Sequence, residues 1–450
     1  MIPDIFKAYD IRGLVGSELT KQFAFSTGVA VAKFLELERE PATVVIGEDM
    51  RPSSPELADA FSAGVTSQGL DVIRIGLAST DMLYFASGKL NLPGAMFTAS
   101  HNPAEYNGIK LCFSGARPIG KESGLLTIEK FVRDGVPVSL RPVGVENHKE
   151  MLKDYVDHLL TLVEVSAIRK LNIVVDAGNG MAGHTAPAVF SRMNVDVTEM
   201  YYELDGTFPN HEANPIDEAN LADLKEMVKQ KKADIGLAFD GDADRCFLVD
   251  EKGNAVNPSL LTALIADREL KKKPGSKIIY NLISSRAVRE IVEENGGKPL
   301  RSRVGHSFIK AMMAESGAIF GGEHSGHFYF ADFWRADSGM LAALHAIAAL
   351  GESEKTLSEL LAPYARYFAS GEINSKVLDS KATMAGIKES YGSKPGVTTD
   401  ELDGLTVDGD TWWFNVRASN TEPLLRLNVE AKTHSQMEAL RDEVLAVIRG

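Results

Sequence analysis

Apolar and polar positions along the chain fall into blocks that predict short strands alternating with helices. Apolar runs rich in β-branched residues, at 43–47, 70–76 and 95–97, are typical of buried strands. Between them, apolar residues recur at helical spacing over 54–69, and a further short helix is expected near 82–87. The order strand, helix, strand, helix, strand predicts a parallel sheet with right-handed crossovers.

The same order of elements recurs twice farther along the chain. In each later block an apolar strand runs directly into a polar loop. The expected strands are 171–176, 195–197, 235–239, 277–281 and 318–320, and the expected helices lie near 185–191, 220–229, 260–270, 286–294 and 307–315. Because the blocks share one order of elements, we expect three similar α/β domains.

The last part of the chain has a different pattern. Residues 411–417 and 424–429 alternate as antiparallel strands do, and 435–449 form an amphipathic helix, so this part predicts a smaller α+β domain. A chain of 450 residues is too long for a single core. The expected domains, three with mixed or parallel sheets and a C-terminal α+β domain, are 1–145, 146–252, 253–362 and 363–450.

Composition and charge exclude several classes of protein. The net charge of −14 opposes nucleic-acid binding, so cationic groups that meet an anionic substrate must be local exceptions. The two cysteines, Cys112 and Cys246, give no disulfide framework and indicate a reducing compartment. No apolar run approaches the roughly 20 residues of a membrane helix, and the N-terminus lacks the features of a signal peptide. We therefore expect a cytoplasmic protein with no nucleic-acid or membrane partner.

A turn at 98–103 carries a serine, a histidine and an asparagine at the end of an expected strand. Ligands of open α/β sheets bind at the carboxyl ends of strands, which makes Ser100 a candidate nucleophile. The neighbouring sequence shows no Asp/His triad that would activate this serine. The alternative interpretation is a serine whose hydroxyl caps the next element. Lys110 either stabilises charge or donates a proton at the same site, or is a lysine at a strand edge.

Three aspartates alternate in the loop after strand 235–239. Asp240, Asp242 and Asp244 held together would repel one another, and a hard cation relieves this. An EF-hand loop is disfavoured because its sixth position is Arg245 and its flanks predict strands rather than helices. A solvated acidic turn is the remaining alternative. Three oxygen ligands and a phosphate suit Mg²⁺, which in turn favours a serine that carries a phosphoryl group.

Two later loops suggest sugar and phosphate recognition. Glu323 and Ser325, two apart on a loop taken as extended, would point the same way and suit paired sugar hydroxyls. A metal site at His324 and His327 is the weaker alternative, because the aspartate loop already meets that need. Residues 304–307 offer either another polar contact or a helix cap at the serine of 307.

The loop 417–423 joins the two terminal strands and is rich in hydrogen-bond donors. An arginine, a serine, an asparagine and a threonine within five positions predict a phosphate-binding loop, and a polar hairpin turn is the alternative.

At the other end of the chain, 6–13 is interpreted by itself as a hairpin or loop with a surface arginine, Arg12.

Together these segments resemble the α-D-phosphohexomutase superfamily, the phosphomannomutase/phosphoglucomutase enzymes. Residues 98–103 resemble its phosphoserine loop, 240–245 its Mg²⁺ loop, 322–327 its sugar-binding loop and 417–421 its phosphate loop. The four loops stand in family order across essentially the whole chain. Residues 9–13 match the family's N-terminal motif, which changes the interpretation of Arg12 to a site residue.

The resemblance implies four domains around a central cleft and an intramolecular phosphotransferase, an isomerase. Phosphorylated Ser100 would give its phosphoryl group to a hexose 1- or 6-phosphate, the bisphosphate would turn around, and its other phosphate would return to Ser100. The implied cofactor is Mg²⁺, with a sugar 1,6-bisphosphate as activator. The implied partners are small hexose phosphates, and the oligomeric state, monomer or dimer, stays open.

The resemblance also assigns residues to roles. Metal binding is assigned to Ser100, Asp240, Asp242 and Asp244; catalysis to Ser100, Lys110, Arg245, His327 and His101; and substrate binding to Tyr9, Arg12, His306, Glu323, His324, Ser325, Arg417, Ser419, Asn420 and Thr421.

Substrate choice rests on the sugar loop and the serine turn, which look most like those of phosphomannomutases and dual mannose/glucose enzymes. The alternatives are a phosphoglucosamine mutase, a Mg²⁺-dependent sugar phosphatase that uses the same serine, and a sugar-phosphate-binding protein without turnover. One departure concerns a basic residue that some members carry after Asn281. Leu282 and Ile283 stand there instead, and Arg286 is the candidate replacement.

Overall fold

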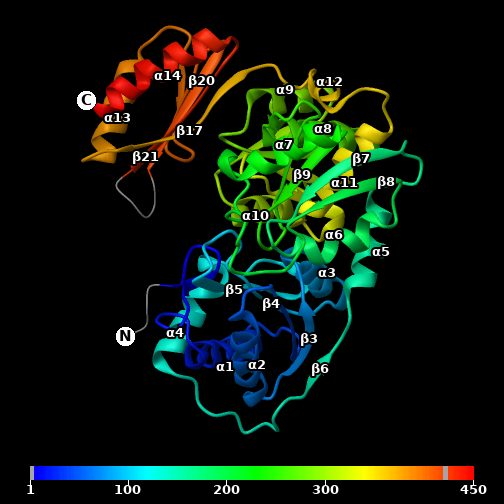
Figure 1. The fold of residues 1–450 in the computed structure, drawn as a ribbon. Helices are drawn as coiled ribbons and strands as arrows, with labels where there is room; N and C mark the ends of the chain where they lie inside the picture. The colour runs from blue at the N-terminus through cyan, green and yellow to red at the C-terminus, as the bar shows by residue number, and fades with distance from the viewer. Residues whose placement is uncertain (1–4, 419–423) are drawn as a thin grey trace.

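The chain folds into four domains, each built on its own sheet, which confirms the predicted fold class. The computed structural model describes residues 5–418 and 424–450, without the side chains at 306 and 307. Figure 1 shows the first domain in blue and cyan, the second and third packed together in green and yellow, and the fourth in orange and red at the upper left. The fourth is joined to the others by the segment after helix α12.

The first sheet is mixed. Its strand order is β1 (Ile11–Leu14), β5 (Tyr106–Cys112), β4 (Gly94–Phe97), β2 (Thr43–Glu48), β3 (Asp71–Leu77) and β6 (Glu146–His148). The three predicted strands β2, β3 and β4 are parallel, whereas β5 and β1 add an antiparallel edge. The helices are α1 (Lys21–Leu37), α2 (Ser54–Ser67), α3 (Thr80–Leu90) and α4 (Leu126–Asp134). The exposed, polar strand β6 carries this sheet past position 145, and no apolar pattern marks it in the sequence.

The second and third sheets repeat this plan. The second runs β11 (Ala255–Val256), β10 (Cys246–Val249), β9 (Ile235–Phe239), β7 (Leu171–Asp176) and β8 (Val195–Met200), with α5 (Leu152–Leu162), α6 (Ala182–Phe190) and α7 (Ala222–Lys231). The third runs β13 (Lys298–Ser302), β12 (Lys277–Asn281), β14 (Phe320–Gly322), β15 (Phe328–Phe330) and β16 (Ala336–Asp337). Its helices are α8 (Pro258–Lys272), α9 (Arg286–Glu294), α10 (His306–Ser316), α11 (Gly339–Gly351) and α12 (Leu357–Leu361).

In each of the three α/β domains, one loop joins a parallel strand to the antiparallel strand beside it. The loop between β4 and β5 carries Ser100, the loop between β9 and β10 carries the aspartates, and the loop between β14 and β15 carries Glu323. The three loops carry different functional side chains, but each lies at the same topological position, the carboxyl end of a central strand.

The fourth sheet is wholly antiparallel, as the alternation predicts. Its order is β17 (Phe368–Lys376), β21 (Leu424–Ala431), β20 (Trp412–Ala418), β19 (Leu405–Asp408) and β18 (Thr398–Asp400), covered by α13 (Ser380–Gly392) and α14 (His434–Arg449). The predicted strand 318–320 is displaced to β14, because Gly321 and Gly322 continue the ladder where a glycine-rich turn was expected.

Burial explains why the first three domains form one body and the fourth stands apart. One apolar core runs through α3, α5 and α11 and joins the first, second and third domains, and every residue of α11 is buried. The fourth domain has its own smaller core. It meets the third domain through a small apolar cluster in which Leu282 and Ile283 pack against Trp413, with Val304 beside them.

Candidate active site

Ser100 and Asp240 come from different domains and form the centre of the site. The Ser100 hydroxyl is 2.9 Å from Oδ2 of Asp240, to which it donates, and 3.1 Å from Nδ1 of His101. The partners of the Ser100 hydroxyl therefore lie in the second domain and in its own turn, which corrects the interpretation of Ser100 as a cap of the next element. Burial lowers the pKa of His101 well below its ordinary range, and Arg245 and Arg12 lower it further. His101 is thus a neutral neighbour of the hydroxyl.

Ser100 sits in a backbone conformation that its surroundings must enforce. Its φ is +51°, in the left-handed region, which costs an L-residue about 1–2 kcal/mol. Arg51, which is buried, donates to the carbonyl oxygens of Ser100 at 3.0 Å and of Asn102 at 2.7 Å. The same guanidinium reaches the carbonyls of Pro103 and Tyr106 at 2.8 and 2.9 Å. Arg51 thus holds the whole turn, although the sequence showed only a loop at its position.

The three aspartates are buried together. Asp240, Asp242 and Asp244 are at most 1% exposed, and carboxylate oxygens from all three lie within 4.8 Å of one another. Their loop joins the antiparallel strands β9 and β10, which agrees with the prediction of strand flanks and excludes an EF-hand and a solvated turn. Burial raises the pKa of Asp240, with Asp244 and Asp242 adding to the rise.

Two cations partly neutralise these carboxylates. Nζ of Lys110 is 2.6 Å from Oδ2 of Asp242 and 2.7 Å from Oδ2 of Asp244. Burial opposes the charge, but the two carboxylates hold the pKa of Lys110 well above its ordinary value. Nε of Arg245 lies 2.9 Å from Oδ2 of Asp240. The side chain of Lys110 therefore turns into the site, which corrects its interpretation as an edge lysine, and the ammonium remains charged.

The residues present fit a divalent cation. Within the described chain, the Oδ1 atoms of Asp242 and Asp244 are buried without a hydrogen-bond partner. Three carboxylates face two cationic side chains, so one negative charge remains uncompensated. Hard oxygen atoms beside a hydroxyl are the donor set that Mg²⁺ prefers. Of the two histidines of the alternative metal site, His327 belongs to a second group of possible ligands with Asp244 and Asp337, whereas His324 belongs to neither group of described residues that could hold an ion.

His327 is held by a chain of charges that the sequence did not reveal. Its Nδ1 is 3.0 Å from Oδ2 of Asp337 and 3.8 Å from Oδ1 of Asp244. Oδ1 of Asp337 is 2.6 Å from Nζ of the buried Lys310, which lies 4.0 Å from the ring centroid of Tyr84 in the first domain. Burial lowers the pKa of His327, but Asp244 and Asp337 outweigh this and raise it overall.

The sugar loop is a tight turn rather than the extended segment assumed from its sequence. The backbone N–H of Gly326 donates to the carbonyl of Glu323 at 3.1 Å, and Glu323 is buried. Its carboxylate accepts from Tyr329 Oη at 2.7 Å and from the Gly305 N–H at 3.1 Å. The turn closes because Glu323 is fixed inward, whereas Ser325 is only half-buried. An extended loop, the reason for expecting Glu323 and Ser325 to point the same way, is therefore not what the structure has at this position.

His324 stands at the rim of this turn. Its Nδ1 is 3.3 Å from the side-chain amide of Asn281. Burial lowers its pKa to about 4, so the ring is neutral at physiological pH and can exchange hydrogen bonds with a polar ligand.

Residues of the N-terminal motif reach the serine turn and the third domain. Arg12 donates to Asn102 Oδ1 and pairs with Asp10, so it is not the surface arginine of the simpler interpretation. The Tyr9 ring packs edge-on against Phe308 with centroids 6.4 Å apart. A cavity of about 570 Å³ lies beside Tyr9 and Arg417, between the first, third and fourth domains.

The predicted phosphate loop is described only at its start. Arg417 Nη2 is 2.6 Å from Glu372 Oε2. Ser419, Asn420 and Thr421 lie outside the described residues, as does the side chain of His306. Helix α10 begins at His306 behind Gly305, so the serine at 307 lies inside the first turn rather than at the cap.

Arg286 does not replace a basic residue near Asn281. Its guanidinium donates to the carbonyls of Asp410 at 2.6 Å and Gly409 at 2.8 Å, and pairs with Asp408. These partners belong to the fourth domain, because α9 runs along the seam between the third and fourth domains. The expected compensation is therefore wrong, and Arg286 fastens two domains together.

Sequence reasoning also missed Thr80, at the start of α3. Its hydroxyl donates to Oδ2 of Asp242 at 2.6 Å, and its N–H donates to the Asp242 carbonyl at 3.0 Å.

Within the described chain no helix is both long and apolar enough to cross a membrane.

Four domain models of one family match the chain in order. The model described as "Phosphoglucomutase/phosphomannomutase, alpha/beta/alpha domain I" matches residues 3–135, domain II matches 153–253, domain III matches 257–367 and the C-terminal domain matches 372–447. Together these matches leave little of the chain uncovered.

Similar proteins and a solved structure belong to the same family as the four domain models. Phosphohexose mutases of Xanthomonas campestris pv. campestris are 40% identical over 99% of each chain, and a phosphomannomutase of Escherichia coli is 39% identical over 99% of each. The structure of a phosphoglucomutase/phosphomannomutase family protein from Burkholderia thailandensis superposes with a TM-score of 0.91 at 31% identity. The superposition covers 99% of this chain and 97% of the Burkholderia chain.

Proposed function

The chain belongs to the phosphoglucomutase/phosphomannomutase family, and from this premise and the site geometry we propose that it interconverts hexose 1-phosphates and hexose 6-phosphates, with mannose phosphates as the principal substrates. Ser100 would carry the transferred phosphoryl group. The single observation that carries this proposal is the Ser100 hydroxyl, 2.9 Å from an aspartate of a buried three-carboxylate cluster.

The first half-reaction transfers the phosphoryl group from phosphorylated Ser100 to the free hydroxyl of the bound sugar phosphate. The bond between phosphorus and Ser100 Oγ breaks, and a bond forms between phosphorus and the sugar oxygen. Lys110 and Arg245 are both charged and pair with the aspartate cluster that the Ser100 hydroxyl contacts, so they stabilise the negative charge that spreads over the phosphoryl oxygens. The reverse transfer, after the bisphosphate turns around, restores phosphoserine.

His327 is the candidate acceptor of the sugar hydroxyl proton. Its Nδ1 hydrogen-bonds to the Asp337 carboxylate, which fixes the orientation of the imidazole ring at the site. Burial lowers the pKa of His327, but Asp244 and Asp337 outweigh burial and raise the pKa above its ordinary value, which favours the ring's holding a proton. Lys110 keeps its proton, so we assign it an electrostatic role.

Asp240, Asp242 and Asp244 would hold Mg²⁺ together with an oxygen of phosphorylated Ser100. When bound, the cation supplies positive charge beside the transferring phosphoryl group. A sugar 1,6-bisphosphate would activate the enzyme by phosphorylating Ser100.

Substrate binding is proposed for residues that ring this centre. Glu323, Ser325 and His324 would meet the sugar hydroxyls, and Arg12 and Tyr9 would border the site from the first domain. Arg417 and the loop that follows it would hold the phosphate that is not transferred. The preference for mannose follows the relatives that carry the name phosphomannomutase.

Paired coupled assays test this proposal. Mannose 1-phosphate and glucose 1-phosphate are compared by kcat/KM, in the presence of the matching 1,6-bisphosphate and Mg²⁺, while free phosphate is measured in the same samples. We expect hexose 6-phosphate to form without accumulation of free phosphate, and to form faster from the mannose substrate. Steady release of phosphate would instead identify a phosphatase, and equal kcat/KM values would overturn the preference for mannose.

A further inference from the structure

We propose that His211 is a positioning residue for Ser100, and that a proton between His211 and Asp176 holds the second-domain loop 205–214 against the turn that carries the serine. His211 acts through Arg51 and not on the substrate. The inference rests on the proposed function and deepens it, because it adds a pH-dependent control over the alignment of the nucleophile.

Both ring nitrogens of His211 face hydrogen-bond acceptors. Nε2 is 2.9 Å from Oδ2 of the buried Asp176, at the end of β7, and Nδ1 is 2.8 Å from the carbonyl oxygen of Glu212. That carbonyl also accepts the N–H of Asn214 at 2.7 Å, and a backbone carbonyl can only accept. A neutral imidazole carries one N–H, so either tautomer would oppose two lone pairs at one of these contacts. Both contacts are satisfied only when a second proton lies between Nε2 and Oδ2.

The surroundings of the ring favour this second proton. The segment after β8 contributes Tyr201, whose ring meets His211 edge-on with centroids 5.3 Å apart and whose hydroxyl donates to Asp223 of α7 at 2.7 Å. The charged side chains that act on the ring from β7 and α7, Asp176 and Asp223, are both carboxylates. Burial lowers the pKa of His211, but Asp176 outweighs burial, the Glu212 carbonyl and Asp223 add to its effect, and the pKa is raised above its ordinary value.

The loop 205–214 reaches across the domain boundary to Arg51. The Phe208 ring lies against the Arg51 guanidinium, with Cζ 5.1 Å from the ring centroid. Gly206 approaches the same residue so closely that a Cβ atom there would lie 2.6 Å from Arg51 Cα. Arg51 in turn donates to the Ser100 carbonyl at 3.0 Å. A shift of the loop is therefore passed to the serine turn through a packed backbone and a fixed guanidinium.

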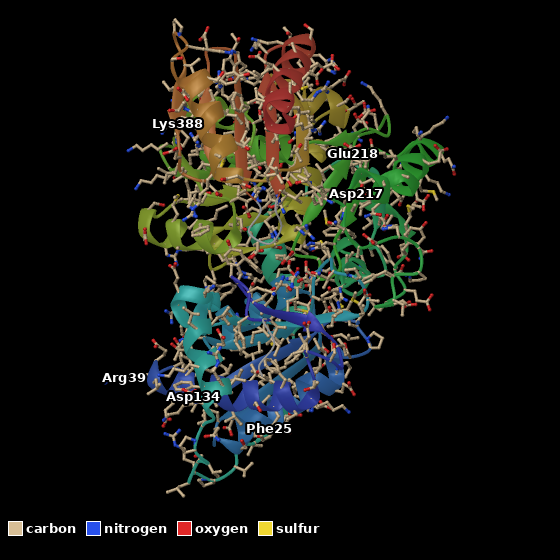
Figure 2. The ribbon with its side chains drawn as sticks, turned by 90° about the vertical axis from the view of Figure 1, so that its left-hand side faces the viewer. Phe25, Arg39, Asp134, Asp217, Glu218 and Lys388 are labelled. Atoms are coloured by element: carbon tan, nitrogen blue, oxygen red, sulfur yellow. The ribbon has the colours of Figure 1, made fainter. Side chains whose placement is uncertain are left out.

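Other bonds keep the loop folded within the second domain. Asn179 accepts twice from it, at its carbonyl from the Asp205 N–H at 3.0 Å and at Oδ1 from the Asn210 side-chain amide at 2.8 Å. Asp217, labelled in Figure 2, donates its N–H to the Asn214 carbonyl at 3.2 Å. Amides do not titrate, so these bonds persist when the bridging proton leaves. Its loss therefore shifts the loop and does not unfold it.

The pH dependence has a defined sign. Because the pKa of His211 in the folded state lies above the ordinary value of 6.5, the bridging proton is fully bound below that value. It is lost as pH rises through the higher folded pKa, and the hold on the loop is lost with it. We expect the shift to slow phosphoryl transfer about tenfold, since a full 1 Å misplacement costs roughly a hundredfold.

Asp176→Asn separates the proton from a purely structural role of the pair. Oδ1 of the carboxylate accepts the Gly178 N–H at 2.8 Å, and the asparagine oxygen can keep this bond. The asparagine amide then donates to Nε2 of a neutral ring, whose Nδ1–H donates to the Glu212 carbonyl. This variant keeps both ring contacts without the second proton, so its hold on the loop should persist at alkaline pH.

The values of kcat and KM for mannose 1-phosphate, with Mg²⁺ and mannose 1,6-bisphosphate present, are measured from about pH 6 to about pH 9. The ratio of kcat in Asp176→Asn to kcat in the wild type cancels titrations that the two proteins share, including that of His327. This ratio should rise about tenfold with pH at unchanged KM, a gain that misfolding cannot produce. Asp196→Asn, at an exposed aspartate of β8, is the matched control and should give a flat ratio.

Proton–nitrogen NMR of the histidine rings observes the proton directly, and His211→Gln identifies the signal. At about pH 6 both nitrogens of the His211 ring should be protonated in the wild type. His211→Gln should lower kcat about tenfold at this pH, with KM unchanged, and the two proteins should converge toward about pH 9. His434→Gln, at an exposed histidine of α14, should match the wild type throughout.

Three results would overturn the inference and leave the proposed function standing. A single protonated nitrogen in the His211 ring at about pH 6 removes the bridging proton. A flat kcat ratio for Asp176→Asn removes the pH-dependent control, and unchanged kcat in His211→Gln removes the positioning role. A wild type that forms no hexose 6-phosphate at any pH contradicts the proposed function together with the inference, and is recognised because all variants are then equally inactive.

Discussion

The Ser100 hydroxyl is 2.9 Å from Oδ2 of Asp240, although the two residues lie 140 positions apart and belong to different domains. The contact forms because the loops after β4 and after β9 meet across the domain boundary. Gly241 lets them approach: a Cβ atom at this position would lie 2.4 Å from the Ser100 carbonyl oxygen. The nucleophile and the acidic cluster are therefore aligned by backbone contact as well as by side chains.

Gly241→Ala should push the two loops apart. A displacement of reacting groups by about 1 Å costs on the order of a hundredfold in rate, and we expect a loss of kcat of that size with folding retained. The measurement is kcat together with the thermal unfolding midpoint. Gly386→Ala, in α13 with open space around its Cβ position, is the control and should keep full activity. Normal activity in Gly241→Ala would show that the loops have no need of this close approach.

Thr80 should set the affinity for Mg²⁺ through Asp242. Its hydroxyl donates to one oxygen of that carboxylate at 2.6 Å and so orients the other. Thr80→Val removes the hydroxyl and should weaken Mg²⁺ binding, measured by calorimetry, about 10–100-fold, as losses of outer-shell partners do. Thr80→Ser should restore the affinity. Equal Mg²⁺ affinity in the valine and serine variants would rule out this role.

Asp337 should act through His327 rather than on the substrate. It accepts the Nδ1 hydrogen bond of that ring and is held in turn by Lys310. Asp337→Asn keeps the size and removes the charge, so kcat should fall on the order of a hundredfold with little change in KM. The matched control is Asp332→Asn, at an exposed aspartate of the same domain. A rise in KM with kcat unchanged would place Asp337 in substrate binding instead.

Stability should depend on pH through Asp81, which lies buried where three domains meet. Burial raises its pKa from 3.8 to about 6, against hydrogen bonds from Ser338, Ser79 and Tyr155. The folded state therefore holds the proton more tightly than the unfolded state does. The resulting stability is fully present below about pH 4 and is lost as pH rises through about 6, by roughly 3 kcal/mol in total.

Unfolding free energies of the wild type and of Asp81→Asn from pH 4 to pH 8 test this prediction. Asparagine does not titrate, so the stability of the wild type relative to the variant should fall across this range. Parallel curves for the two proteins would show that Asp81 has the same pKa folded and unfolded.

Local pattern and chemistry sufficed to predict much of this structure. The apolar runs at 43–47 and 235–239 became central strands because β-branched and aromatic residues suit a buried sheet. The aspartate loop was found because three alternating carboxylates after such a strand need a cation. The alternation after Thr411 predicted the antiparallel fourth sheet for the same kind of local reason.

The features that were missed depend on partners distant in sequence. Arg51, Thr80 and Lys310 look like ordinary loop and helix residues, and their roles arise only when other domains bring Ser100, Asp242 and Asp337 beside them. Arg286 was misassigned because spacing along the chain cannot show that α9 faces the fourth domain. The sugar turn was misjudged because the bonds that bury Glu323 come from Tyr329 and from Gly305.

The central claim is that Ser100 carries the transferred phosphoryl group, and peptide mass spectrometry tests it most directly. The wild type is incubated with mannose 1,6-bisphosphate and Mg²⁺, and mannose 1-phosphate is then added. We predict that one phosphoryl group appears on Ser100 and is discharged at a rate no slower than turnover, while Ser100→Ala folds normally and is inactive. Turnover with no phosphate on Ser100, or a near-normal rate in Ser100→Ala, would contradict the account.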